Sequence, residues 1–323
     1  MNYNVFIVSS PLQVMNAIEA VEHFKTQNNI LLVLHTGDKK HLNQMKKMFN
    51  FSDWDDIEYI LLPLKIVDKI VFAKTINDAL AFMKKKKIEK LFVGEFRSDH
   101  VNHIVNSLET QAVYLLDDGL AQLNYNEEVS QESVQVKVRR AIYRLLFYKL
   151  KTIKYTFFTI FQIKNEKIIP NKYNFFRKQI SNKKIENVTF FIGQPLVELG
   201  IMSQENYKNE LIKIMNFYKE KEFIYISHRR EKIANVQELS LALNFTYKVF
   251  DTLIELEMIN ATIVPSSFAT FYSTAIVTLP RFIPKAEYTV FKSQEAMINK
   301  NFIVNISNTY KEFTRMGLKV EQL

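Results

Sequence analysis

The chain has 323 residues, 47% of them hydrophobic, and carries a formal net charge of +9 at pH 7. It contains no cysteine, which excludes disulfides, thiolate zinc sites and a cysteine nucleophile. Its apolar runs are well short of the roughly 20 residues that a membrane-spanning helix needs, and the N-terminus lacks the basic segment of a signal peptide. We therefore expect a cytoplasmic protein, and its basic balance suits an anionic partner.

The first half of the chain alternates short apolar runs with helical patterns. Strands are predicted at 4–10, 30–37, 57–64, 90–96 and 112–116, and helices at 11–24, up to about 49, at 66–87 and at 99–108. Continuous apolar strands that are separated by helices indicate a parallel sheet covered on both faces.

The second half follows the same pattern. Strands are predicted at 187–195, 222–228, 246–251 and 261–267, with helices near 203–220, 233–243 and 267–277. The predicted fold class is α/β, with two Rossmann-like, doubly wound domains at 1–165 and 166–323 that face a central cleft.

A basic, aromatic segment at 136–164 lies between the two halves. It can be a linker helix whose apolar stripe packs on the domains. It can also lie on an anionic membrane, with Lys and Arg at the headgroups and Phe and Tyr inserted. Different faces of the segment can satisfy both interpretations.

Two aspartates directly follow a predicted strand in the stretch VYLLDDG. Open α/β sheets bind ligands at the carboxyl ends of their strands, so Asp117 and Asp118 lie where a substrate is expected. Successive strand residues point to opposite faces, so one carboxylate can serve as a general base while the other holds a loop. An Asp-Gly turn with a helix cap is the alternative.

A serine pair and a histidine follow strands of the second half. Ser266 and Ser267 end one strand and open a helical pattern, where hydroxyls and backbone N–H groups form either an anion site or a plain N-cap. His228 is followed by Arg229 and Arg230, and such a group can neutralise a phosphate. A structural or solvated histidine is the alternative.

Several common motifs are missing from the sequence. It has no P-loop, no G-x-G-x-x-G and no D-x-D, so a bound nucleotide is expected to be held without a metal ion. The positive charge is dispersed and no nucleic-acid-binding motif occurs, so a nucleic-acid partner is not expected. The oligomeric state stays open.

Three short motifs stand in the order found in bacterial sialyltransferases: an acidic pair before glycine, a histidine and a serine pair. Here they are Asp117-Asp118-Gly119, His228 and Ser266-Ser267. The stretches SSPLQVMNAIEA and FIGQPL also resemble elements of the lipooligosaccharide sialyltransferases, glycosyltransferase family 52. The chain is similar to this family over most of its length, which implies a GT-B fold.

The resemblance implies transfer of sialic acid from CMP-sialic acid to a sugar hydroxyl of a capsule or lipooligosaccharide, with inversion and without metal. We favour Asp117 as the base that deprotonates the acceptor, with Asp118 supporting the loop. The other implied contacts are the CMP phosphate at His228, Ser266, Ser267 and Arg229, the ribose at Glu255, the nucleotide pocket at Gly193 and Gln194, and the acceptor side at Ser10, Pro11, Gln13 and Arg97.

The sequence departs from the family at one motif, because Arg229 stands where the family has a proline after the histidine. Three functions therefore compete: the sialyltransferase, a GT-B transferase with another donor (CMP-Kdo, another nonulosonate or a UDP-hexose), and a non-catalytic, membrane-associated polysaccharide-assembly protein.

Overall fold

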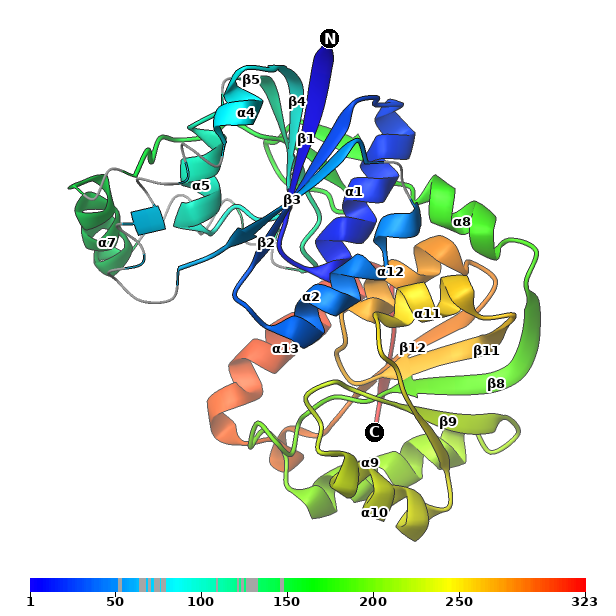
Figure 1. Cartoon of the computed structure of the whole chain (residues 1–323). Coiled ribbons are helices and arrows are strands. Elements are labelled where there is room, and N and C mark those ends of the chain that lie inside the picture. Colours follow the sequence, from blue (N-terminus) through cyan, green and yellow to red (C-terminus); the bar gives the residue numbers. More distant parts are fainter. Residues whose placement is uncertain are drawn as a thin grey trace. The chain divides into compact units, whose positions relative to one another are not determined.

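The computed structural model describes residues 1–51, 54–63, 68, 71–72, 76, 80–108, 110–120, 122, 125, 133–145 and 148–323. The chain divides into two compact units, Met1–Lys172 and Tyr173–Leu323 (Figure 1). The boundary lies seven residues after the predicted one at 165/166, because β7 (Ile168–Pro170) still pairs with the preceding strand of the first unit.

The first unit is built on a seven-stranded sheet in which the described strand pairs all run parallel. The strand order is β3 (Asp56–Leu61), β2 (Asn29–His35), β1 (Asn2–Val8), β4 (Lys87–Val93), β5 (Thr110–Leu116), β6 (Thr156–Thr159) and β7. The described helices are α1 (Pro11–Phe24), α2 (Lys39–Lys46), α4 (Ala81–Lys84), α5 (Asp99–Val105) and α7 (Val134–Leu145), with a 3-10 turn at Phe49–Phe51.

Local sequence signals explain how β1 passes into α1. Ser10 is the N-cap and its hydroxyl accepts from the backbone N–H of Gln13 at 3.3 Å, while Pro11 fits the first helical position. In the core, the ring of Phe6 on β1 stacks on Phe92 of β4 at 4.4 Å between centroids. The carboxyl ends of β1 and β4 are thereby held next to each other.

The second unit contains a six-stranded parallel sheet. Its order is β10 (Thr246–Val249), β9 (Glu222–Ser227), β8 (Lys184–Ile192), β11 (Ile263–Thr270), β12 (Glu287–Lys292) and β13 (Lys319–Gln322). Its helices are α8 (Asn174–Ile180), α9 (Gln204–Phe217), α10 (Ile233–Leu243), α11 (Ile254–Asn260), α12 (Ala275–Phe282) and α13 (Ile303–Arg315), with 3-10 turns at Glu295–Met297 and Lys300–Phe302.

The predicted strand end at Ser266 and Ser267 is wrong. Strand β11 continues to Thr270, and Ser267 is fully buried within it, opposite Glu287 at the start of β12. The Ser267 hydroxyl accepts from the ammonium of Lys221 and donates to the carboxylate of Glu287 at 3.1 Å. These partners satisfy a polar group inside a strand, so the serine pair does not mark its carboxyl end.

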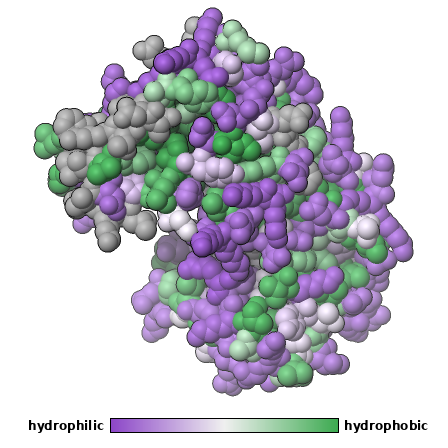
Figure 2. Space-filling model, viewed as in Figure 1, coloured by the Kyte–Doolittle hydropathy of each residue, from purple (hydrophilic) through white to green (hydrophobic). Residues whose placement is uncertain are grey.

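The basic segment forms α7 and then leads into β6. One face of α7 packs on the first unit: Tyr143 is buried, and Arg139 and Arg140 each bond the Asp99 carboxylate at 2.8 Å. The opposite face exposes Val134, Val138, Ile142 and Leu145, and Figure 2 shows hydrophobic side chains on the surface in this region. Among the described residues, no helix combines the length and apolarity needed to cross a membrane.

Candidate functional site

Each sheet reverses its strand order at one place, between β1 and β4 in the first unit and between β8 and β11 in the second. Open parallel sheets bind ligands at the carboxyl ends of the strands beside such a reversal. The residues that follow β1, β4 and β5, and those that follow β8, β9 and β11, are therefore the candidates in each unit.

Asp117, which the sequence favoured as the base, is buried and hydrogen-bonded within the first unit. Its side chain is only 2% exposed, and its carboxylate accepts from the Thr159 hydroxyl and from the backbone N–H of Ile160 at 3.0 Å. These bonds tie the end of β5 to the end of β6. Strand β6 was not predicted, so these partners of Asp117 were not visible in the sequence.

Asp118 is the carboxylate that is presented at the end of β5. It is partly exposed, and its Oδ1 accepts from the Gln13 amide Nε2 at 3.0 Å. Burial raises the pKa of Asp118, while the bond from Gln13 and the positive charge of Arg97 oppose the shift. Gly119, at a φ of 66°, lets the chain turn away directly after it.

Gln13 is held in the orientation that Asp118 needs. Its Oε1 accepts from the backbone N–H of Ser9 at 2.7 Å and from the Ser9 hydroxyl at 3.1 Å, so its Nε2 is left for the carboxylate. Gly94 makes room for this amide, since a Cβ at position 94 would lie 2.3 Å from Oε1. Of the residues predicted for the acceptor side, Ser10 and Pro11 start α1, and Gln13 positions Asp118.

Glu95 is a functional candidate that the sequence reasoning did not select. It follows β4, and its pKa is raised by burial and also by the negative charge of Asp118, while Arg97 lowers it. The two carboxylates therefore interact, and one proton is more easily kept at the pair than at either group alone. The signal was present in the strand tail GEFR, which carries an acid beside the predicted Arg97.

His228 follows β9 and is a neutral imidazole at physiological pH. Burial, together with the charges of Arg229 and Arg230, lowers its pKa to about 4, against a weaker opposing effect of Glu198. Its Nδ1 lies 3.1 Å from the backbone N–H of Arg230 and accepts from it. The ring proton of the neutral form is therefore on Nε2, which makes His228 a hydrogen-bond donor. Arg229 is exposed beside it.

A buried chain of polar groups holds the His228 loop. Glu231 accepts from the backbone N–H of His228 at 2.6 Å and from the Tyr225 hydroxyl at 2.5 Å, and Tyr225 in turn bonds Tyr207 at 2.6 Å. Burial raises the pKa of Glu231 to about 7. Gly193 leaves room for the Tyr225 hydroxyl, because a Cβ at position 193 would lie 2.4 Å from it.

Gln194 fixes the turn that leaves β11. Its Oε1 accepts from the backbone N–H of Tyr272 at 2.8 Å, and the Thr270 hydroxyl bonds the carbonyl of Ile192 at 2.9 Å. The turn places the hydroxyls of Ser273 and Thr274 at the start of α12. A Ser-Thr pair before an apolar helix is typical of a helix N-terminus. The hydroxyl pair at the start of the helix is therefore residues 273–274, whereas the sequence analysis placed it at 266–267.

Glu255 lies inside the second unit. It is 5% exposed, and its carboxylate accepts from the Thr278 hydroxyl, which links α11 to α12. Burial raises its pKa, with the Thr278 bond opposing. The structure thus gives Glu255 an intramolecular partner at the position where a ribose contact was predicted.

The model of glycosyltransferase family 52 matches residues 64–294. This chain belongs to glycosyltransferase family 52. The predicted family is confirmed, and with it the classification of the protein as a glycosyltransferase. A search of curated protein sequences finds no match to the chain.

Solved structures share the fold of this family 52 protein at low identity. The UDP-GlcNAc 2-epimerase of Methanocaldococcus jannaschii is 13% identical, over 100% of this chain and 89% of that one, with a TM-score of 0.55. A putative UDP-N-acetylglucosamine 2-epimerase of Listeria monocytogenes is 9% identical, over 90% and 78%, with a TM-score of 0.51. The predicted GT-B type of fold, with two parallel-sheet domains, is confirmed by these likenesses, which show the fold alone.

Proposed function

We propose that this family 52 protein is an inverting sialyltransferase that moves sialic acid from CMP-sialic acid to a sugar hydroxyl of a bacterial capsule or lipooligosaccharide. The observation that carries the catalytic part is Asp118, a partly exposed carboxylate of raised pKa that Gln13 orients at a strand end. The choice of donor rests on family membership.

The proposed reaction is a single displacement. Asp118 accepts the proton of the acceptor hydroxyl as its oxygen bonds to the anomeric carbon of sialic acid. The bond from that carbon to the CMP phosphate oxygen breaks, the electron pair leaves with CMP, and the anomeric configuration inverts. The leaving phosphate is stabilised by the Nε2–H of His228, by Arg229, and by the hydroxyls of Ser273 and Thr274 at the start of α12.

The function is tested by donor hydrolysis in the absence of an acceptor. We expect the purified protein to release CMP slowly from CMP-sialic acid and to bind CMP more tightly than UDP, as measured by chromatography of the nucleotides and by calorimetry. Tighter binding of UDP than of CMP would assign the protein to the class that uses a UDP-sugar. Absence of any nucleotide binding would favour a non-catalytic role.

The proposal includes peripheral binding to the cytoplasmic membrane face through α7. Its exposed apolar side chains lie at helical spacing and are flanked by exposed cations such as Lys149 and Lys154. Val138→Asp with Ile142→Asp should abolish co-sedimentation with phosphatidylglycerol vesicles, because both charges would enter the lipid interface. Ser133→Asp, just before the helix, is the control, and equal loss in both proteins would speak against the apolar stripe.

A further inference from the structure

A cavity of about 710 Å³ lies in the first unit between α5, α7 and the chain that leads into β6. Six cationic residues line it: Arg97, Lys137, Arg139, Arg140, Arg144 and Lys151. Among the lining residues that the structure describes, none is a carboxylate. Like charges gathered at one concave surface repel one another, so such a cavity favours an anionic occupant.

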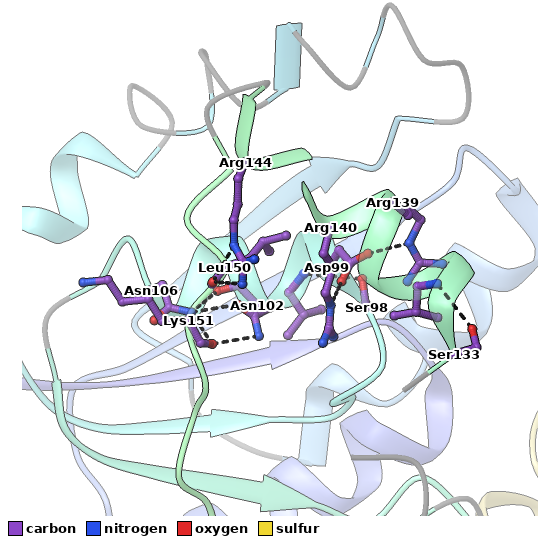
Figure 3. Close-up of polar contacts among 12 residues, drawn as sticks. Ser98, Asp99, Asn102, Asn106, Ser133, Arg139, Arg140, Arg144, Leu150 and Lys151 are labelled. Atoms are coloured by element: carbon purple, nitrogen blue, oxygen red, sulfur yellow. Dashed lines mark hydrogen bonds and ion pairs between the residues drawn. The ribbon is translucent and has the colours of Figure 1, made fainter. Parts of the chain in front are cut away.

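The cationic groups are held in place by bonds within the unit, as Figure 3 shows. The buried Asp99 carboxylate at the start of α5 accepts from the Nε atoms of Arg139 and Arg140, each at 2.8 Å. Arg144 donates to the carbonyl of Leu150 at 3.1 and 3.3 Å. These bonds hold the guanidinium groups of Arg139, Arg140 and Arg144 in place, which lowers the entropy cost of binding an oxyanion.

The chain around Lys151 is fixed in the same way. Its carbonyl accepts from the amide of Asn102 at 3.2 Å and from that of Asn106 at 3.3 Å, both on α5 (Figure 3). Lys137 and Lys151 have exposed side chains, and neither ammonium has an ion-pair partner among the described residues. These two lysines can therefore bring charge to a ligand without first giving up a carboxylate partner.

The cavity also has an aromatic wall that suits a sugar. Phe96, Tyr125 and Tyr155 line it, with the rings of Phe96 and Tyr125 in edge contact at 5.0 Å. The half-buried ring of Phe96 can pack against the apolar face of a pyranose ring, while Tyr125 and Tyr155 are only 8% and 7% exposed. The volume lies within the ~300–1,000 Å³ of small-ligand pockets, which fits a few sugar rings rather than a nucleic-acid helix.

The cavity is linked to the proposed base through Arg97. This residue lines the cavity, and its charge lowers the pKa of both Glu95 and Asp118. Strands β4 and β5 are parallel neighbours, with Val93 opposite Leu115, so Arg97 and Asp118 follow the same edge of the sheet. A ligand that occupies the cavity therefore lies on the acceptor side of the site, within the first unit.

From these observations we propose that the cavity binds the acceptor, and that the acceptor is an anionic saccharide whose phosphate or carboxylate groups lie against the cationic wall. The aromatic wall holds the sugar ring next to these groups, and a hydroxyl of the same saccharide reaches Asp118. The assignment rests on the proposed function for the identity of the reaction, but the cavity can be tested by binding alone.

The test uses lactose, lactose carrying one phosphate, and sialyllactose as probes, with calorimetry on the whole protein. We expect both charged lactoses to bind at least about tenfold more tightly than lactose, since their charged groups make charge-assisted hydrogen bonds that lactose cannot make. The advantage should shrink at high salt. A preference for one charged lactose separates a phosphate-bearing from a carboxylate-bearing acceptor.

Lys137→Gln with Lys151→Gln should remove most of that advantage. The matched control is Lys25→Gln with Lys87→Gln, which removes the same charge at the amino edge of the same sheet and should leave the charged lactoses bound as before. Urea denaturation of the same preparations reports that the first unit, which holds all four lysines, is folded.

Several results would overturn the assignment. One is equal binding of charged and neutral lactose, and another is an equal loss of binding in the two double variants. A third is that Lys137→Gln with Lys151→Gln loses binding to phosphatidylglycerol vesicles but keeps its binding of the charged lactoses, which would make the cavity a lipid site. The proposed function fails separately, because it requires CMP binding and donor hydrolysis whatever the cavity binds.

Discussion

Asp118→Asn is expected to reduce sialyl transfer by at least about a hundredfold, the lower range for loss of a general base. The substitution keeps the shape of the side chain and an oxygen that can accept from Gln13, but it removes the group that takes the acceptor proton. CMP binding should persist, because the residues proposed for CMP lie in the second unit. The measurement is the initial rate of transfer to a saturating acceptor, with CMP affinity alongside.

Asp117→Asn is the matched control and should affect stability instead. Its amide would place an NH₂ group against the Ile160 N–H or the Thr159 hydroxyl, so at least one buried bond is lost. We expect a loss of about 1–3 kcal/mol in the free energy of unfolding, measured by urea denaturation. A hundredfold loss of transfer at unchanged stability would instead return the base role to Asp117.

The pH profile provides a second readout of the same prediction. Asp118 acts as a base only when deprotonated, and its raised pKa moves the acid limb of transfer above the usual range of a carboxyl group. Arg97 opposes that shift, so Arg97→Gln should move the limb to still higher pH. Because burial penalises the charged Asp118, Asp118→Asn should not lower stability at neutral pH. An acid limb that stays in place in Arg97→Gln would contradict the assignment.

The parallel sheets could be predicted because their strands are continuous apolar runs that end in polar residues. This pattern located β1, β2, β4, β5, β8 and β9 and the side chains at their carboxyl ends, including Asp118 and His228. Short or less apolar strands, such as β6 and β7, give a weak signal because their burial depends on neighbours far along the chain. Because β6 was not predicted, the bonds of Asp117 to Thr159 and Ile160 were not predicted either.

Ser267 shows the opposite error. A serine pair is typical of a strand end or a helix cap. The bonds that allow Ser267 inside β11 come from Lys221, just before β9, and from Glu287 on β12. The Tyr207–Tyr225–Glu231 chain likewise joins residues that no local pattern connects. Polar residues whose partners are distant in sequence are therefore where single-sequence interpretation fails, both in the fold and in the site.

His228→Ala is expected to lower the rate of transfer by about a hundredfold or more, the usual cost of losing a donor to the developing charge. The charge on the CMP phosphate grows as the bond to sialic acid breaks, so the Nε2–H bond strengthens in the transition state. The loss should therefore appear in kcat, with little change in the KM for the donor. Because the pKa of His228 is lowered to about 4, the ring is neutral across the working pH range.

His228→Gln separates a neutral donor from a general acid. The Gln amide can donate an N–H bond but cannot give up a proton, so we expect it to restore part of the activity lost in His228→Ala and to leave the pH profile unchanged. Nδ1 is already engaged by the backbone N–H of Arg230, which leaves only Nε2 for the phosphate. If His228→Gln were as inactive as His228→Ala and the wild-type basic limb vanished in both, His228 would be the acid that protonates the leaving group, and its pKa in the donor complex would have to lie far above its value in the free protein.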